Sequence, residues 1–191
     1  QLAQDELPQS ASGKTIMTTE PKFIPKEAVS INVADNLDMK VKMIDCVGYV
    51  VKDAEGQFED GKERMVRTPW FDYDIPFSKA AEIGTNKVIN NHSTVGIVVT
   101  TDGSFGELPR ESYLEAEQKT VDELKAIGKP FVILLNTDKP SSSQTAALSA
   151  EMSDTYGASV IPVNVEQLRE SDITYIFTEL LMSFPVKSIY F

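Results

Sequence analysis

Short apolar runs alternate with longer segments of helical pattern over the second half of the chain. The apolar runs predict buried strands at 94–101 (TVGIVVTT), 131–136 (FVILLN) and 159–163 (SVIPV). The periodic segments predict helices at 78–91, 110–127, 142–156 and 172–183, with Ser78 as a cap and with Gly128 and Gly157 just past two helix ends. Strands that are apolar throughout and separated by helices indicate an α/β fold, with a mostly parallel sheet and helices on both faces.

The first half of the chain has a different pattern. Two β-rich runs, 28–34 (AVSINVA) and 40–46 (KVKMIDC), flank the turn signal DNLD and predict a hairpin. Residues 52–77 are polar and carry two glycines and two prolines, which predicts a long insertion or mobile segment. The length of 191 residues favours one domain over 1–191. In a parallel sheet of this kind, ligands bind at the carboxyl ends of the strands.

Charge and composition exclude some classes of partner. The net charge of −11 argues against a nucleic-acid partner and against electrostatic binding to anionic lipid, because both need clustered Lys and Arg. The apolar runs are too short to cross a membrane. The single cysteine excludes an internal disulfide and fits a reducing compartment. The chain starts with Gln1 rather than Met, which favours a fragment of a longer protein.

The pattern Asp-x-x-Gly occurs three times, and its surroundings separate the copies. DAEG at 53–56 lies in a polar loop, and DTYG at 154–157 ends a helix. Only DCVG at 45–48 directly follows an apolar strand, as in nucleotide hydrolases, where the Asp faces Mg²⁺ and the Gly amide faces the last phosphate. The alternative is that Asp45 only caps a turn that Gly48 permits.

A phosphate-cradling loop is not found within this sequence. GKT at 13–15 looks like the end of a P-loop, but Pro8 stands where the pattern needs Gly, and proline has no amide hydrogen. Thr18 and Thr19, in the segment TIMTTEPKF at 15–23, could close on a metal and a γ-phosphate. The alternative for this segment is an ordinary β-rich loop.

The segment FVILLNTDKP at 131–140 indicates which nucleotide base the protein could recognise. GTP-binding domains end this strand in Asn-Lys-x-Asp; here Asn136 is in place, but Thr137 replaces the Lys and Lys139 replaces the Asp. Lysine cannot accept hydrogen bonds from guanine, so guanine is disfavoured. The singletons Cys46, Trp70 and His92 are interpreted as structural or surface residues, and the remaining charges as mostly solvated helix faces.

Several segments together resemble one family. In chain order they are TIMTTEPKF, DCVGY, RTPWF, IPF, AAEIGT, HSTVGIVVTTDGSFGELPR, GKPFVILLN and ESD. The chain resembles, over nearly all its length, the stage IV sporulation protein A family, the morphogenetic ATPases of the spore coat. The resemblance implies a GTPase-like P-loop fold that uses ATP and Mg²⁺, with the P-loop and the first strand lying upstream of position 1. It also implies self-polymerisation on the forespore surface in the mother-cell cytoplasm, with other coat proteins and a small membrane-associated coat peptide as partners bound mainly through other regions.

The resemblance also implies roles for single residues. Thr18 and Thr19 resemble γ-phosphate-sensing threonines, with Thr18 and Asp45 as the metal-side residues. Gly48 resembles the switch amide, and Asn136 lies where the base-facing loop is expected. Tyr49 stands where many related enzymes place a water-orienting Gln. Without a P-loop this chain is expected to bind ATP weakly or undetectably. A nucleotide-independent scaffold is the alternative, and a regulatory GTPase a minor one.

Overall fold

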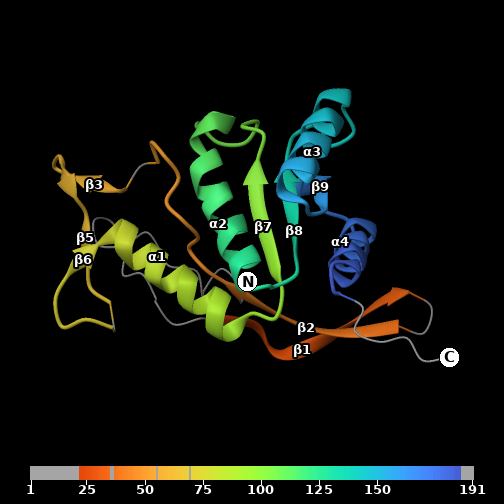
Figure 1. Ribbon diagram of the computed structural model, residues 1–191, viewed down its shortest axis with the longest axis horizontal. Helices are drawn as coiled ribbons and strands as arrows, with labels where there is room; N and C mark the ends of the chain where they lie inside the picture. The colour runs from red at the N-terminus through yellow and green to blue at the C-terminus, as the bar shows by residue number, and fades with distance from the viewer. Residues whose placement is uncertain (1–21, 35–36, 55, 69, 186–191) are drawn as a thin grey trace. The chain divides into compact units, whose positions relative to one another are not determined.

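The computed structural model describes residues 22–34, 37–54, 56–68 and 70–185 (Figure 1). The chain divides into two compact units. The first contains the described residues up to Val29 together with Lys40–Ser93, and the second contains Ser30–Met39 together with the described residues from Thr94 onward. The prediction of one domain over 1–191 therefore stays a prediction, with two units as the observed organisation.

A parallel three-stranded sheet organises the second unit. Its strands are β7 (Gly96–Thr101), β8 (Phe131–Asn136) and β9 (Val160–Val163), in the order β7-β8-β9 (Figure 1). Gly96 lies opposite Phe131, and Ile133 opposite Val160. The helical segments are η2 (Arg110–Ser112), α2 (Leu114–Ala126), α3 (Ser143–Tyr156), η3 (Val165–Gln167) and α4 (Glu170–Met182). This arrangement confirms the predicted α/β class and the parallel pairing.

The core of the second unit is centred on β8. Every residue from Phe131 to Leu135 is buried, so both faces of this strand are covered. Helix α2 packs on β7, α3 on β9 and α4 on β8. The helices contribute further buried apolar side chains, among them Val121, Leu124, Met152, Ile176 and Leu180. Burial of these side chains is the main favourable term that holds the unit together.

Strand β7 is less buried than its sequence predicts. Val98 and Thr100 are buried, but Ile97 is 36% exposed and Val99 is 62% exposed. The reason is its position, because β7 lies at an edge of the sheet formed by the described residues. The prediction of a wholly buried strand is therefore wrong for one of its two faces. An apolar sequence at a sheet edge is unusual, since edge strands commonly carry charges.

The ends of the helices follow local capping chemistry. Helix α3 starts as predicted, because the Ser142 hydroxyl accepts a hydrogen bond from the Thr145 N–H at 3.1 Å, and Gly157 ends it at φ 57°. Ser78 is not a cap: α1 (Phe77–Lys87) starts directly after Pro76, whose φ of −53° already suits a helix start. Helix α4 starts at Glu170, before the predicted 172, because Asp172 accepts a hydrogen bond from the Arg169 N–H.

The other strands precede α1 in the chain, and the first two of them are divided between the two units. Strands β1 (Lys22–Ala34) and β2 (Leu37–Asp45) pair in a two-stranded sheet, which confirms the predicted hairpin. Two smaller antiparallel pairs follow within 52–77: β3 (Phe58–Glu59) with β4 (Lys62–Glu63), and β5 (Met65–Val66) with β6 (Ile75–Pro76). A small core joins this segment to α1 through Val66, Ile75, Ala80 and Ala81. That 52–77 is an insertion remains a prediction, but it carries regular pairing and core residues.

The helix predicted at 78–91 consists of two parts. Regular α-helix ends at Lys87, and a π-helical turn, η1 (Val88–His92), continues from it. The apolar pattern does not distinguish these two forms, since Val88 and Ile89 are buried in either case. Wide turns of this kind are frequent at functional sites.

Candidate functional site

The Asp-x-x-Gly loop starts where β2 ends. Asp45 is the last residue of the strand, and its side chain is exposed. Gly48 has a φ of +77°, in the left-handed region that glycine adopts without strain. Its carbonyl oxygen accepts a hydrogen bond from the Thr85 hydroxyl on α1, at 3.0 Å. The sequence therefore places an exposed carboxylate at a strand end, next to a turn that a glycine makes possible.

The C-terminal side of this loop is fixed to α1 by neighbouring residues. The Tyr49 hydroxyl donates to the Asn86 side-chain oxygen at 3.1 Å. Val50 packs against the small core of the first unit. Thr85 is 1% exposed, so its hydrogen bond to the partly buried Gly48 starts from an enclosed hydroxyl. The loop is thus held on one side, while Asp45 on the other side faces solvent.

The same turn of α1 contacts the 52–77 segment through Trp70. A side-chain carbon added at Gly84 would lie 3.4 Å from the Trp70 ring, so helix and ring pack closely. The Lys87 ammonium lies 5.1 Å from the centre of that ring, within the range of a cation–π contact. One turn of α1 therefore supports the Asp-x-x-Gly loop and the indole of the preceding segment.

Polar residues gather at the carboxyl ends of the strands in the second unit. Asp102, directly after β7, accepts hydrogen bonds from the Ser104 N–H at 2.9 Å and from the Thr137 hydroxyl at 2.6 Å. Thr137, directly after β8, is fully buried. Burial acts to raise the pKa of Asp102, but the hydrogen bonds from Ser104 and Thr137 outweigh it and lower that pKa. These contacts tie the loops after β7 and β8 together.

Asn136, the last residue of β8, is half-buried. Its side-chain oxygen accepts a hydrogen bond from the Val165 N–H at 3.0 Å, which links the ends of β8 and β9. Lys139, three residues further on, pairs with the neighbouring Asp138 at 3.4 Å, and both side chains are largely exposed. The position of Asn136 at a strand carboxyl end agrees with the general location of ligand sites in parallel sheets.

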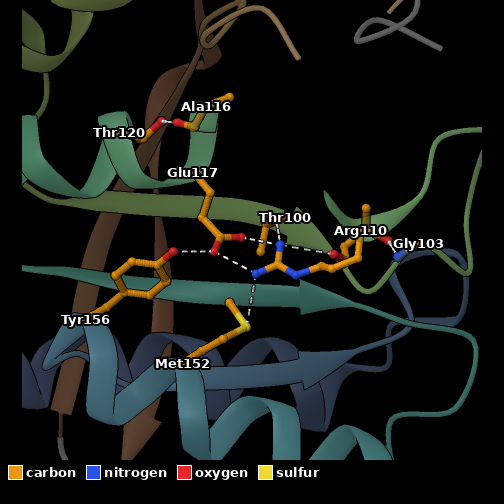
Figure 2. A network of polar contacts seen from close by, with 9 residues as sticks. Thr100, Gly103, Arg110, Ala116, Glu117, Thr120, Met152 and Tyr156 are labelled. Atoms are coloured by element: carbon orange, nitrogen blue, oxygen red, sulfur yellow. Dashed lines mark hydrogen bonds and ion pairs between the residues drawn. The ribbon is translucent and has the colours of Figure 1, made fainter. Parts of the chain in front are cut away.

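A largely buried ion pair lies next to Thr100, near the carboxyl end of β7 (Figure 2). The Arg110 guanidinium, at the end of the loop after β7, donates to both carboxylate oxygens of Glu117 on α2, at 2.5 and 2.6 Å. The Tyr156 hydroxyl of α3 donates to the same carboxylate at 2.6 Å, and Arg110 also donates to the Thr100 hydroxyl at 3.0 Å. The Glu117 side chain is 1% exposed. The network joins β7, α2 and α3 through one carboxylate.

The pKa values of this network follow its contacts. Burial acts to raise the pKa of Glu117, but hydrogen bonds from Arg110 and Tyr156 outweigh it and lower that pKa below the ordinary range. Burial and the Glu117 carboxylate both raise the pKa of Tyr156. The sequence-based interpretation of charges as mostly solvated is wrong for Glu117. Its spacing to Val121 and Leu124, which places it on the buried face of α2, is the signal that could have found it.

The residues expected to form a nucleotide site lie in different parts of the chain. Asp45 and Gly48 belong to the first unit and Asn136 to the second, while Thr18 and Thr19 lie outside the described residues. Within the described ranges, no group of three or more His, Cys, Asp or Glu side chains could hold a metal ion. A single exposed carboxylate such as Asp45 still fits Mg²⁺ in nucleotide sites, where phosphates and water supply most ligands. Over the same ranges, no helix has the length and apolar character of a membrane span.

The fold and these loops define an α/β protein with polar loops at the carboxyl ends of a parallel sheet, together with an Asp-x-x-Gly loop after a separate strand pair. The family described as "Stage IV sporulation protein A, ATPase domain" matches residues 1–185, and the chain belongs to this family.

Three relatives support this membership. Stage IV sporulation protein A of Bacillus anthracis is 51% identical over 99% of the chain, that of Bacillus subtilis (strain 168) 49% over 98%, and that of Clostridioides difficile (strain 630) 50% over 97%. The chain covers 38% of the length of each relative. No solved structure matches the chain.

Proposed function

We propose that this chain is part of the ATPase domain of a coat morphogenetic protein that hydrolyses ATP to drive its own assembly around the forespore. The observation that carries the proposal is the Asp-x-x-Gly loop. Asp45 is exposed at a strand end, and Gly48 follows at positive φ in a loop fixed to a helix. A nucleotide hydrolase needs this combination, a free carboxylate for the metal side and a positioned amide for the last phosphate.

Each residue of the proposed site has a defined task. Asp45 orients the hydration shell on the metal side, and the Gly48 amide donates toward the terminal phosphate. Thr18 and Thr19 supply a hydroxyl and an amide that close on the same group. Mg²⁺, when bound with ATP, neutralises charge on the phosphates. The remaining contribution of the chain is positioning, which accounts for most of the catalysis in phosphoryl transfer.

The proposed nucleotide is ATP rather than GTP. Asn136 lies at the end of β8, where it would face the base, and Lys139 replaces the guanine-pairing carboxylate. The exposed Lys139 side chain offers guanine only donors. Competition between ATP and GTP for the full-length protein separates this proposal from a regulatory GTPase, since the GTPase would prefer GTP.

The proposed fold is a GTPase-like P-loop fold. The apolar edge strand β7, with Val99 62% exposed, supports a further strand beside it in the longer protein. This sequence contains no G-x-x-x-x-G-K-S/T loop, so we propose that the 191-residue chain binds ATP weakly or undetectably. Calorimetric titration that shows micromolar binding would contradict this part.

Membership of the family supports a proposal for the biological setting. We propose that the whole protein polymerises at the forespore surface in the mother-cell cytoplasm. Its proposed partners are copies of itself, other coat morphogenetic proteins and a small membrane-associated coat peptide, mainly through regions beyond this chain. The net charge of −11 makes nucleic acid an unsuitable partner.

The three copies of Asp-x-x-Gly provide a matched test. In the full-length protein, Asp45→Asn should lower the rate of Mg²⁺-dependent ATP hydrolysis by about 100-fold or more. Asp53→Asn and Asp154→Asn change the same residue type in the other two copies, both exposed, and should leave turnover unchanged. Equal turnover in all three variants would refute the proposed site.

A nucleotide-independent scaffold is the second candidate. It is favoured by the contacts of Asp102, Thr137 and Asn136, whose side chains are already engaged within the second unit. Electron microscopy of Asp45→Asn assemblies distinguishes the two functions. Loss of assembly together with hydrolysis supports the ATP-driven function, and normal assembly without hydrolysis supports the scaffold.

A further inference from the structure

We propose that Thr85 and Asn86 are positioning residues for the Asp-x-x-Gly loop. They are consecutive on α1, and they bind the consecutive loop residues Gly48 and Tyr49. Through these two contacts the helix sets where the loop, and with it the Gly48 amide, is held. This inference rests on the proposed function in one respect only, the effect on ATP turnover.

The contact of Thr85 fixes the peptide unit that follows Gly48. A φ of +77° at Gly48 turns its carbonyl toward α1, where the Thr85 hydroxyl donates to it at 3.0 Å. Thr85 is 1% exposed and Gly48 is partly buried, so the donor side of this contact is enclosed by protein. A partly buried hydrogen bond of this kind is costly to remove, since the carbonyl then loses its protein donor.

The contact of Asn86 gives the Tyr49 hydroxyl a supporting role. That hydroxyl donates to the Asn86 side-chain oxygen at 3.1 Å. The Asn86 backbone carbonyl is in turn bound by the Asn90 side chain of the π-helical turn, at 2.8 Å. Tyr49 stands where many related enzymes have a water-orienting Gln, but its hydroxyl proton is directed at the helix. The tyrosine therefore anchors the loop.

Two anchors on one helix turn restrict the loop more than either alone. Displacing one anchor lets the loop pivot about the other, and displacing both releases it from α1. Catalytic groups tolerate little displacement, because a misplacement of about 1 Å can lower a rate about 100-fold. The Gly48 amide is proposed to act on the terminal phosphate, so its displacement should lower kcat more than ATP affinity, which the rest of the nucleotide dominates.

The test uses the full-length protein with Thr85→Val, which keeps the shape and removes the hydroxyl, and Thr85→Ser, which restores a hydroxyl. Thr85→Val should lower kcat for ATP about 10-fold or more with a change in the Kd for ATP of under about 3-fold. Amide hydrogen exchange of residues 46–50 should become faster. Thr85→Ser should restore most of the kcat and most of the slow amide exchange. Tyr49→Phe should also lower kcat and speed the exchange at 46–50, but by less than Thr85→Val.

Results that differ from these expectations refute either the anchoring of the loop or its role in catalysis. Thr85→Val with unchanged exchange at 46–50 refutes the anchoring, even if the wild-type protein hydrolyses no ATP and the proposed function fails. Faster exchange with unchanged kcat refutes the positioning role. If Thr85→Val does not fold, Tyr49→Phe decides the question, because exchange at 46–50 equal to that of the wild type then refutes the anchoring. Combined Thr85→Val and Tyr49→Phe should be non-additive, since both act on one loop.

Discussion

Arg110 and Glu117 form a two-pronged contact in which each carboxylate oxygen accepts a separate guanidinium N–H, at 2.5 and 2.6 Å. The pair closes the loop after β7 onto the start of α2, seven residues along the chain. The Tyr156 hydroxyl brings α3 to the same carboxylate. Such bidentate, charge-assisted contacts are strong and strict in geometry.

Removing the charge of Glu117 should destabilise the protein. Glu117→Gln takes the anionic partner away from the Arg110 guanidinium, whose side chain is 14% exposed, and breaking a buried ion pair in this way typically costs about 3–5 kcal/mol of unfolding free energy. Chemical denaturation of the variant measures this. Glu115→Gln removes an exposed glutamate from the same helix and should change the unfolding free energy by less than about 0.5 kcal/mol. Equal effects of the two changes would show that the network contributes nothing.

The lowered pKa of Glu117 predicts a dependence of stability on pH. A carboxyl group whose pKa is lower in the folded than in the unfolded protein stabilises the fold above its unfolded pKa, and this stabilisation is lost as the pH falls through the folded value. The difference in unfolding free energy between wild type and Glu117→Gln should therefore be largest at neutral pH and shrink below the ordinary value of 4.5. A constant difference across that range would contradict the assigned shift.

Gly103 should tolerate no side chain. Its φ is +88°, and an added Cβ would lie 2.9 Å from the Arg110 backbone nitrogen. Gly103→Ala therefore combines backbone strain with a clash and should cost more than the 1–2 kcal/mol expected for positive φ alone, about 3 kcal/mol in total. Gly128→Ala is the control, with a φ of +67° and open space around the added carbon. Thermal unfolding that ranks the two equally would show that the approach to Arg110 is unimportant.

Thr137 should be required as a donor. Thr137→Val keeps the shape of a fully buried side chain but removes its hydroxyl. That hydroxyl donates a hydrogen bond to the Asp102 carboxylate, with 2.6 Å between the two oxygens. Loss of a hydrogen bond to a charged group should cost about 1.5–3 kcal/mol of unfolding free energy. Thr137→Ser retains the hydroxyl and should cost less. Hydrogen exchange of the loops after β7 and β8 should rise together in the Val variant, and a rise in only one of them would contradict their coupling.

Sequence patterns were sufficient where a local rule decides the structure. FVILLN forms a strand from Phe131 to Asn136 as predicted, and α3 covers the predicted range and ends at Gly157. The sequence-based prediction of the helix start failed at α1. The helix begins after Pro76, whose φ is fixed, and Ser78 is not a side-chain cap. Sequence patterns also failed on the exposed face of β7, because exposure there depends on which strand lies alongside.

In the candidate site, too, some features follow from local sequence and others only from the tertiary fold. Asp45 and Gly48 were recognisable because a short motif follows a strand, and Asn136 because it ends one. The partners of this loop, Thr85 and Asn86, lie 37 residues further along the chain, and no local pattern connects them to it. Glu117 and Tyr156 lie on different helices, 39 residues apart, and are likewise brought together only by the tertiary fold.

The packing of Trp70 on α1 provides an optical probe. Trp70 is the only tryptophan among the 191 residues, and its ring lies against Gly84 and Lys87. That turn also carries Thr85 and Asn86. The emission of the 191-residue chain therefore comes from an indole beside the turn that holds the Asp-x-x-Gly loop. Its spectrum and its access to quenchers can follow movement of this turn without an attached label.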